Sequence, residues 1–237
     1  MRVQGLDIVY VVKDAVYNDE LKYSLRSVEK NFQGIRYVWF YGGKPIQFRP
    51  DKQVIVKQKG PTKWDNVRDM MRSIAKNDDI TEDFIFFNDD FFVMKPTQEL
   101  PAYRYKTIES LCTWVEQQRN LGHSSVYTSN LRDVARELQA SGFPTINFAL
   151  HLPIIFNREK LIEALDKFPN TKSPRSVYGN MFLAKDAVIH KDVKIFRSKD
   201  MPPEDTDFIS TEDYVFRDGA VGKFIRECFP NKSRWER

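Results

Sequence analysis

The chain reads Phe84-Ile85-Phe86-Phe87-Asn88-Asp89-Asp90-Phe91-Phe92-Val93, so two adjacent carboxylates lie inside a strongly apolar stretch. Four of the five residues before the acids are Ile or Phe, types that favour a strand buried on both faces. Two acids at the end of such a strand are costly unless their charge meets something positive. A hard divalent cation would meet it and would then hold the phosphates of a substrate. The stretch predicts a metal–diphosphate site, although two solvated acids that open a turn would leave the same pattern.

Strand-like and helix-like segments alternate on both sides of this stretch. β-rich runs predict strands over residues 6–12, 35–41 and 52–57. Apolar residues at helical spacing predict helices over 19–32, capped by Asn18, and over 64–74, after Thr62. Further helices are expected over 129–140, over 158–168 after Asn157, and over 221–229. The alternation predicts an α/β fold with a mixed, mostly parallel sheet flanked by helices and with helical additions in the second half. Ligands of such sheets gather at the carboxyl ends of strands, where the two acids fall.

The composition is that of a soluble globular protein, with 41% hydrophobic and 30% charged residues in 237. No repeat and no linker divides the chain, so we expect a single domain over residues 1–237. A formal net charge of +4 is compatible with a phosphorylated substrate or a polyanionic acceptor, and solvated lysines explain it equally well. No apolar run reaches the roughly 18 residues of a membrane span, and no signal-peptide pattern is present. The expected location is therefore the cytoplasm, with Cys112 and Cys228 as reduced thiols.

Three residues outside the acidic pair are candidates for chemistry. His151 lies in an apolar stretch before Pro153. A histidine in such a place is more often a buried structural residue, but it can also act as a base on an acceptor hydroxyl. The Arg175 guanidinium suits phosphate oxygens, but a surface arginine would look the same. Asp213 follows a short strand-like run and would either complete a metal site or cap a turn.

Several well-known sites are missing from the sequence. There is no phosphate-binding Gly-x-x-x-x-Gly-Lys loop, no Gly-x-Gly-x-x-Gly turn and no Gly-x-Ser-x-Gly elbow. The spacings Cys-x-x-Cys and His-Glu-x-x-His are also missing, which disfavours zinc, and we expect His123 and His190 to be structural. The chemistry left open is activation of a phosphate ester or glycosyl phosphate by an oxygen-ligated metal.

Four segments, read in order, resemble the Stealth family, which comprises bacterial capsular polysaccharide phosphotransferases and the catalytic part of the lysosomal-enzyme N-acetylglucosamine-1-phosphotransferase. The likeness lies in residues 7–12, in 18–30 with 86–92, in 149–153 with the helix that follows, and in 207–213 with 229–236. The chain is shorter than most members, and Val12-Lys13-Asp14 stands where the family continues with Trp-Val-Asp/Asn-Gly.

This resemblance implies a GT-A-like fold, a UDP-sugar donor and Mg²⁺ or Mn²⁺. It implies that residues 1–100 bind the nucleotide sugar and that 101–237 form the acceptor and catalytic half. The residue roles that it implies are the following: His151, Arg175 and Asp90 catalytic; Arg26, Asn88 and Arg175 at the nucleotide-sugar cofactor, with a bracing role as the alternative for Arg26; and Asp89, Asp90 and Asp213 at the metal.

The function predicted from the sequence is metal-dependent transfer of a sugar-1-phosphate or a sugar to an acceptor hydroxyl. The acceptor would be a glycan, a polyol phosphate or another hydroxyl compound, and a hydroxymethylated DNA base is left open. Attack on phosphorus would release UMP, whereas attack on the anomeric carbon would release UDP, and the same residues would serve both. The rival from another class is a non-catalytic binder of a sugar nucleotide or a polyanion. The sequence does not fix the oligomeric state.

Overall fold

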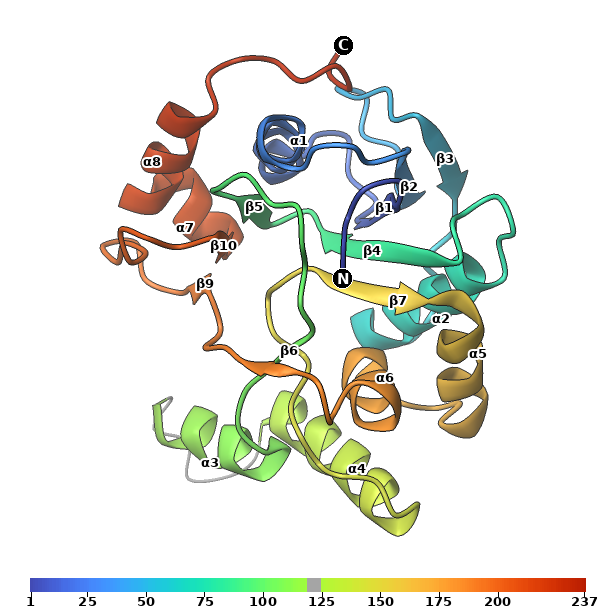
Figure 1. Cartoon of the computed structure of the whole chain (residues 1–237). Coiled ribbons are helices and arrows are strands. Elements are labelled where there is room, and N and C mark those ends of the chain that lie inside the picture. Colours follow the sequence, from blue (N-terminus) through green and yellow to red (C-terminus); the bar gives the residue numbers. More distant parts are fainter. Residues whose placement is uncertain (119–124) are drawn as a thin grey trace.

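The structure, a computed structural model, describes residues 1–118 and 125–237, and a five-stranded sheet with helices on both faces lies at its centre (Figure 1). In the order β3-β2-β1-β4-β7, the sheet consists of β3 (Lys52–Ile55), β2 (Val38–Gly42), β1 (Asp7–Val12), β4 (Asp83–Asn88) and β7 (Ile154–Asn157). The first four strands run parallel and β7 runs antiparallel to β4. The mixed, mostly parallel sheet predicted from the sequence is confirmed.

The helices over residues 19–31, 63–75, 126–140, 158–167 and 220–228 match predicted helices, whereas those over 108–118, 174–182 and 213–218 were not predicted. In chain order, the helices are α1 (Asp19–Asn31), α2 (Lys63–Ala75), α3 (Ile108–Gln118), α4 (Val126–Ala140), α5 (Arg158–Lys167), α6 (Pro174–Phe182), α7 (Asp213–Asp218) and α8 (Ala220–Cys228). The predicted caps of the first two helices are present, because Asn18 accepts a hydrogen bond from the Leu21 amide at 3.0 Å and Thr62 accepts one from the Asp65 amide at 3.3 Å.

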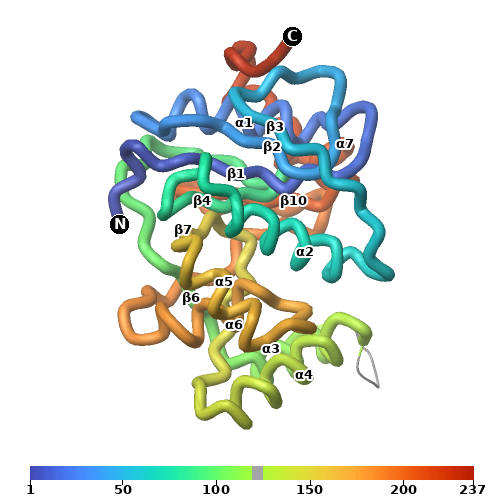
Figure 2. Tube along the Cα trace, turned by 90° about the vertical axis from the view of Figure 1, so that its right-hand side faces the viewer, coloured from blue at the N-terminus to red at the C-terminus, as the bar shows by residue number. Residues whose placement is uncertain are grey.

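The central strand β4 is buried on both faces, as its sequence predicts. Phe84 and Phe86 pack into a core shared with α2, α5 and α6, whereas Ile85 and Phe87 pack on the opposite face with α1. Figure 2 shows these layers from the side, with α1 and the C-terminal segment above the sheet and α2, α5 and α6 below it. Within the described residues, no helix has both the length and the apolar character needed to cross a bilayer.

A second sheet continues the chain beyond the two acids. It has the order β5-β10-β9 and consists of β5 (Phe91–Val93), β10 (Phe208–Thr211) and β9 (Lys194–Ile195). Ser210 pairs with Phe91 on one side and with Lys194 on the other. This register brings Lys194 of β9 beside the turn between β4 and β5. A third, two-stranded sheet joins β6 (Tyr103–Arg104) to β8 (Val188–Ile189).

The predicted helix after Asn157 is present as α5, and Asn157 accepts a hydrogen bond from the Lys160 amide at 3.2 Å. Strand β7, which was not predicted, precedes this helix and pairs with β4. The helix α6, which carries Arg175, was not predicted: it begins at a proline and contains Gly179, which breaks the apolar pattern. That glycine is required for packing, since a Cβ at its position would lie 2.2 Å from the Phe148 ring.

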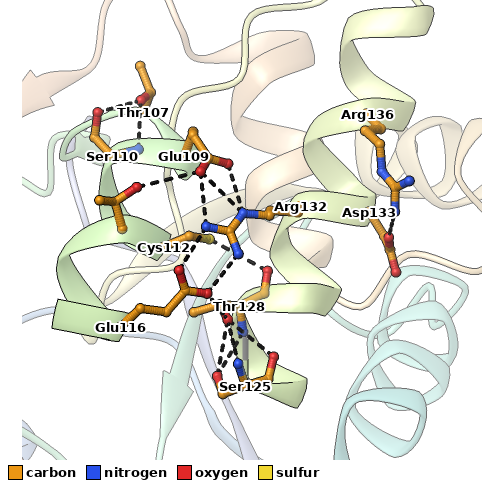
Figure 3. A network of polar contacts seen from close by, with 11 residues as sticks. Thr107, Glu109, Ser110, Cys112, Glu116, Ser125, Thr128, Arg132, Asp133 and Arg136 are labelled. Atoms are coloured by element: carbon orange, nitrogen blue, oxygen red, sulfur yellow. Dashed lines mark hydrogen bonds and ion pairs between the residues drawn. The ribbon is translucent and has the colours of Figure 1, made fainter. Parts of the chain in front are cut away.

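The helical addition consists of α3 and α4, held together by a polar network (Figure 3). Arg132 on α4 donates to Glu109 at 2.9 Å and to Glu116 at 2.7 Å, both on α3. Thr128, which also bonds the helix cap Ser125, donates to Glu116 at 2.7 Å. The pair lies below α5 and α6 at the end of the molecule opposite the C-terminus (Figure 2). Cys112 on α3 and Cys228 at the end of α8 are free thiols.

The C-terminal segment is tied to α1 by a buried ion pair. Arg26 donates through Nε and Nη2 to the two carboxylate oxygens of Glu236, each at 2.7 Å, and through Nη1 to the carbonyls of Phe229 and Pro230. Both side chains are less than a tenth exposed. Because these contacts occupy the whole guanidinium fork, they favour the bracing role for Arg26 over contact with a nucleotide.

Removal of this brace should destabilise the fold. We expect Arg26→Ala to lower the free energy of unfolding by about 3–5 kcal/mol, since Glu236 is left buried without a counter-charge. Urea unfolding measures the change. The matched control is Arg234→Ala, because Arg234 is 57% exposed and lies 4.0 Å from Glu29, so a change below about 1 kcal/mol is expected there. Equal, small losses in both variants would contradict the assignment.

Candidate active site

The connections of the central sheet define where a ligand would lie. α1 leaves β1 and packs on one face, whereas α2 packs on the other face and leads to β4, so the chain reverses its direction of winding between β1 and β4. In open α/β sheets, ligands bind in the crevice outside the carboxyl ends of the strands at such a switch point. Asn18, just after β1, donates to Asp89, just after β4, at 2.6 Å. This hydrogen bond bridges the two strand ends.

Asp89 is a half-buried acid whose charge is incompletely balanced. Burial, followed by the negative charge of Asp90, raises the pKa of Asp89 to about 6, although the hydrogen bond from Asn18 and the charge of Lys13 act in the opposite direction. The charged form is therefore less stable here than in water. A cation placed beside this carboxylate would stabilise its charged form.

Asp90 is only 8% exposed and already has a cationic partner. Lys194 donates to Asp90 Oδ2 at 2.7 Å, and Ser210 donates to the same oxygen at 2.8 Å. Lys194 also lies 3.4 Å from the carboxylate of Glu212. No described residue donates a hydrogen bond to the second oxygen, Asp90 Oδ1.

Glu20 and Asp213 form a carboxyl pair next to the acids of the β4–β5 turn. Glu20, in the first turn of α1, is 5% exposed, accepts from Thr211 at 2.8 Å and is hydrogen-bonded to Asp213. Burial first, and then this bond, raise the pKa of Glu20 to about 9, whereas the same bond lowers the pKa of Asp213. Of the two carboxyl groups, Glu20 is therefore the one whose surroundings favour the protonated form, and Asp213 the one whose surroundings favour the ionised form. Asp213 is largely exposed and also accepts from Lys13 at 3.2 Å.

The three acids predicted to share a metal are not gathered into one ligand group. In the part of the chain that the structure describes, no cluster of three or more His, Cys, Asp or Glu side chains is arranged to hold a metal ion. The reason is that Lys13 and Glu20 hold Asp213, while Lys194 holds Asp90. Mg²⁺, however, is usually bound through one or two carboxylates together with substrate phosphates. Two carboxylates such as those of Asp89 and Asp90, which are neighbours in the chain, fit that pattern.

His151 is paired with a carboxylate that the sequence did not single out. Its Nδ1 lies 2.8 Å from Asp192 Oδ2, and its backbone amide donates to Asp192 Oδ1 at 3.0 Å. Although burial raises the pKa of Asp192, the charge of His151 and the hydrogen bonds from it lower that pKa overall. A carboxylate at Nδ1 fixes the ring tautomer and leaves Nε2 to accept a proton.

Arg175 connects the histidine segment with the acids. Its Nη2 donates to the carbonyl of Leu152, next to His151, and its guanidinium lies 5.9 Å from the centre of the Phe91 ring, next to Asp90. Burial lowers the pKa of Arg175 to about 10, and the charges of Asp192 and Asp90 partly offset this effect. The group thus remains a cation at neutral pH. Its Nε is buried and has no hydrogen-bond partner among the described residues, so it is an unsatisfied donor.

The remaining sequence candidates have simpler surroundings. Asn88 ends β4 opposite Val11 and is half-buried, with no side-chain hydrogen bond to any described residue. His190 lies 2.6 Å from the carbonyl of Lys191 and packs edge-on against Tyr103. His123 lies outside the described residues.

A cleft of about 430 Å³ opens beside Glu20 and Asp213. Aromatic and basic side chains from the β1–α1 loop, α1, α7 and α8 line it, among them Tyr17, Tyr23 and Arg226. Sequence analysis did not identify this cleft, because its walls come from segments about two hundred positions apart.

The raised pKa of Glu20 has a measurable effect on stability. Because the folded-state pKa, about 9, exceeds the ordinary value of 4.5, the contribution of the protonated form is complete below about pH 4.5 and is lost as the pH rises towards 9. Glu20→Gln keeps an uncharged group at this position at every pH. We expect the unfolding free energy of this variant, relative to that of the wild type, to rise by at least about 1 kcal/mol between pH 5.5 and 9.

Urea unfolding at several pH values without divalent metal tests this expectation. Because the pKa of Asp213 is lowered, this carboxylate stays ionised over the whole pH range and adds no pH dependence to the comparison. Glu227→Gln, on the exposed side of α8, is the control, and its unfolding free energy should follow pH as that of the wild type does. A constant difference between Glu20→Gln and the wild type would show that Glu20 is already ionised at neutral pH.

Comparison with known proteins supports the fold but no named family. No protein-family model matches the chain, and no curated protein matches its sequence. The structure of the galactosyltransferase LgtC in complex with donor and acceptor sugar analogues matches with a TM-score of 0.51 and 12% identity over 96% of each chain. An active-site mutant of LgtC gives 0.49 and 11% over 94% of this chain and 95% of that chain.

The glycosyltransferase GlyE of Streptococcus pneumoniae TIGR4 matches at a TM-score of 0.36 and 11% identity, over 79% of this chain and 45% of that chain, which is too low to carry an argument. The likeness to LgtC confirms the predicted GT-A-type fold. The resemblance to the Stealth family has no counterpart among these matches.

Proposed function

We propose that this chain is a metal-dependent transferase that moves a sugar-1-phosphate or a sugar from a UDP-sugar to an acceptor hydroxyl. One observation carries the proposal: Arg175 bonds the carbonyl of Leu152, beside His151, and its guanidinium lies 5.9 Å from the ring centre of Phe91, beside Asp90 at the switch point of a GT-A-type sheet. Arg175 thus joins the segment that carries the carboxylates to the segment that carries the carboxylate-paired histidine. These are the groups that a transfer from a diphosphate needs.

The division of labour follows from the positions of the side chains. His151 Nε2 takes the proton of the acceptor hydroxyl, while Asp192 keeps Nδ1 protonated and stabilises the imidazolium that forms. Arg175 Nε donates to an oxygen of the sugar-bearing phosphate. Asp89 and Asp90 hold Mg²⁺ or Mn²⁺, which when bound supplies positive charge to the diphosphate and to the leaving group. Residues 1–100 would then bind the donor and residues 101–237 would supply the base.

The Stealth resemblance favours transfer of the sugar-1-phosphate. In that reaction the acceptor oxygen attacks the sugar-bearing phosphorus, the bond to the nucleoside monophosphate breaks, and UMP leaves. In glycosyl transfer the acceptor attacks the anomeric carbon and UDP leaves. A glycan or a polyol phosphate is the expected acceptor, and the cytoplasm the expected location.

Incubation of the protein with a panel of UDP-sugars, Mn²⁺ and candidate acceptors tests the proposal. The acceptors include oligosaccharides, polyol phosphates and DNA that contains hydroxymethylcytosine. Chromatography of the released nucleotide distinguishes UMP, which supports phosphosugar transfer, from UDP, which supports glycosyl transfer. Absence of turnover, together with UDP-sugar binding that is indifferent to Mn²⁺, would favour the non-catalytic binder.

A further inference from the structure

The ammonium group of Lys194 occupies one oxygen of Asp90, an acid proposed above to bind the metal ion. Its Nζ donates to Asp90 Oδ2 at 2.7 Å and lies 3.4 Å from Glu212. The side chains of Lys194 and Asp90 are only 10% and 11% exposed. A lysine is seldom so buried unless it is paired, and this one is held by the register of β9 against β10, which also aligns Ser210 with Asp90.

A divalent ion on Asp90 Oδ2 would compete with this ammonium for the same oxygen. Mg²⁺ and Mn²⁺ bind carboxylate oxygens at about 2.1 Å, so an ion there would lie close to Nζ, which is 2.7 Å from that oxygen. Two cations so close in a poorly hydrated site repel strongly. Lys194 has a flexible four-carbon stem with three donors, and a phosphate oxygen is a natural new partner for its charge.

We propose that Lys194 neutralises Asp90 while the donor site is free, and that the divalent ion displaces its ammonium onto the diphosphate of the donor. Lys194 thereby competes with the divalent ion when no donor is bound, and it stabilises the complex once the ion and the donor are both bound. Metal and donor then bind cooperatively, because the cost of displacing the lysine is recovered only when the diphosphate arrives. The inference rests on the proposed function, since it assigns a further residue to that same site.

Titration with Mn²⁺, followed by the loss of free-ion EPR signal, tests the first half of the inference. Lys194→Met removes the competing charge and should bind Mn²⁺ about tenfold or more tightly than the wild type in the absence of nucleotide. Titration with UDP at saturating Mn²⁺ tests the second half. There the same variant should bind about tenfold or more weakly, because the diphosphate loses a cationic partner.

Lys95→Met is the matched control for the general effect of removing one positive charge. Lys95 is 38% exposed and pairs with Asp205 and Asp207, which are not acids of the proposed site. We expect its removal to change Mn²⁺ affinity by no more than about threefold. Equal gains in the two variants, or no gain in Lys194→Met, would overturn the inference.

A structural measurement on the wild type covers the case in which Lys194→Met does not fold. In crystals grown with Mn²⁺ and UDP, Lys194 Nζ should have left Asp90 and should lie within hydrogen-bond distance of a phosphate oxygen. An ion bound at Asp89 and Asp90 with Nζ still on Asp90 would refute the displacement. Wild-type protein that binds neither Mn²⁺ nor UDP would refute the proposed function itself, which keeps the two failures distinct.

Discussion

The double substitution Asp89→Asn with Asp90→Asn is expected to lower nucleotide release from a UDP-sugar by roughly a thousandfold or more. A metal ion contributes several kcal/mol of charge stabilisation to such a transfer, and each 1.4 kcal/mol is about tenfold in rate. The two amides have nearly the shape of the carboxylates but cannot supply the charge that holds the ion. Mn²⁺ binding should therefore be lost together with the activity.

The single variant Asp89→Asn separates a functional acid from a structural one. The pKa of Asp89 is raised to about 6, so its ionised form destabilises the fold at pH 8. We expect this variant to be as stable as the wild type at pH 8 or more stable, and yet to lose most of its activity. Thermal unfolding and steady-state assays measure the two effects.

Asp205→Asn, at a side chain that is 98% exposed, is the control for general loss of negative charge and should keep wild-type activity. Metal-dependent turnover at the wild-type rate in the double variant would remove Asp89 and Asp90 from the mechanism. A destabilised single variant at pH 8 would instead assign Asp89 a structural role.

Removal of the histidine base gives the second large effect. His151→Ala should lower turnover by about two to four orders of magnitude while leaving the affinity for the UDP-sugar nearly unchanged, because a general base acts on the acceptor hydroxyl in the transition state. Asp192→Asn should give a smaller loss, roughly 10- to 100-fold, because the imidazole loses the carboxylate that orients it. Single-turnover assays with a saturating donor measure both.

His190→Ala is the matched control, since His190 bonds the adjacent carbonyl of Lys191 and no acid of the site. It should retain the wild-type rate. Unchanged turnover in His151→Ala would show that another group accepts the proton. An equal loss of donor affinity and of turnover would indicate a binding role for His151 instead.

Local patterns in the sequence were sufficient for most of the sheet and its helices. Apolar β-branched and aromatic runs predicted β1 and β4, and the caps Asn18 and Thr62 predicted where α1 and α2 begin. The signals missed short elements and elements with atypical residues, and the 11-residue helix α3 was also not predicted. β7 is a four-residue strand between a proline and a helix, and α6 begins at Pro174 and contains Gly179.

The site divides in the same way. Asp89 and Asp90 stood out because acids at the end of an apolar strand are rare, whereas His151 and Arg175 were candidates with structural alternatives until a family resemblance implied roles for them. Glu20, Asp192 and Lys194 carried no such signal. Each looks like an ordinary charged residue until its partner is known, and the structure supplies those partners.

The sequence by itself determined that a parallel sheet would end in two carboxylates, because strand burial and helix capping depend on residues that are close in the chain. Only the tertiary structure decided what surrounds those carboxylates. Lys194 meets Asp90 across 104 positions, and Thr211 meets Glu20 across 191. Contacts of that kind depend on the packing of the C-terminal strands against the central sheet, and charge and proton affinity at the site follow from that packing.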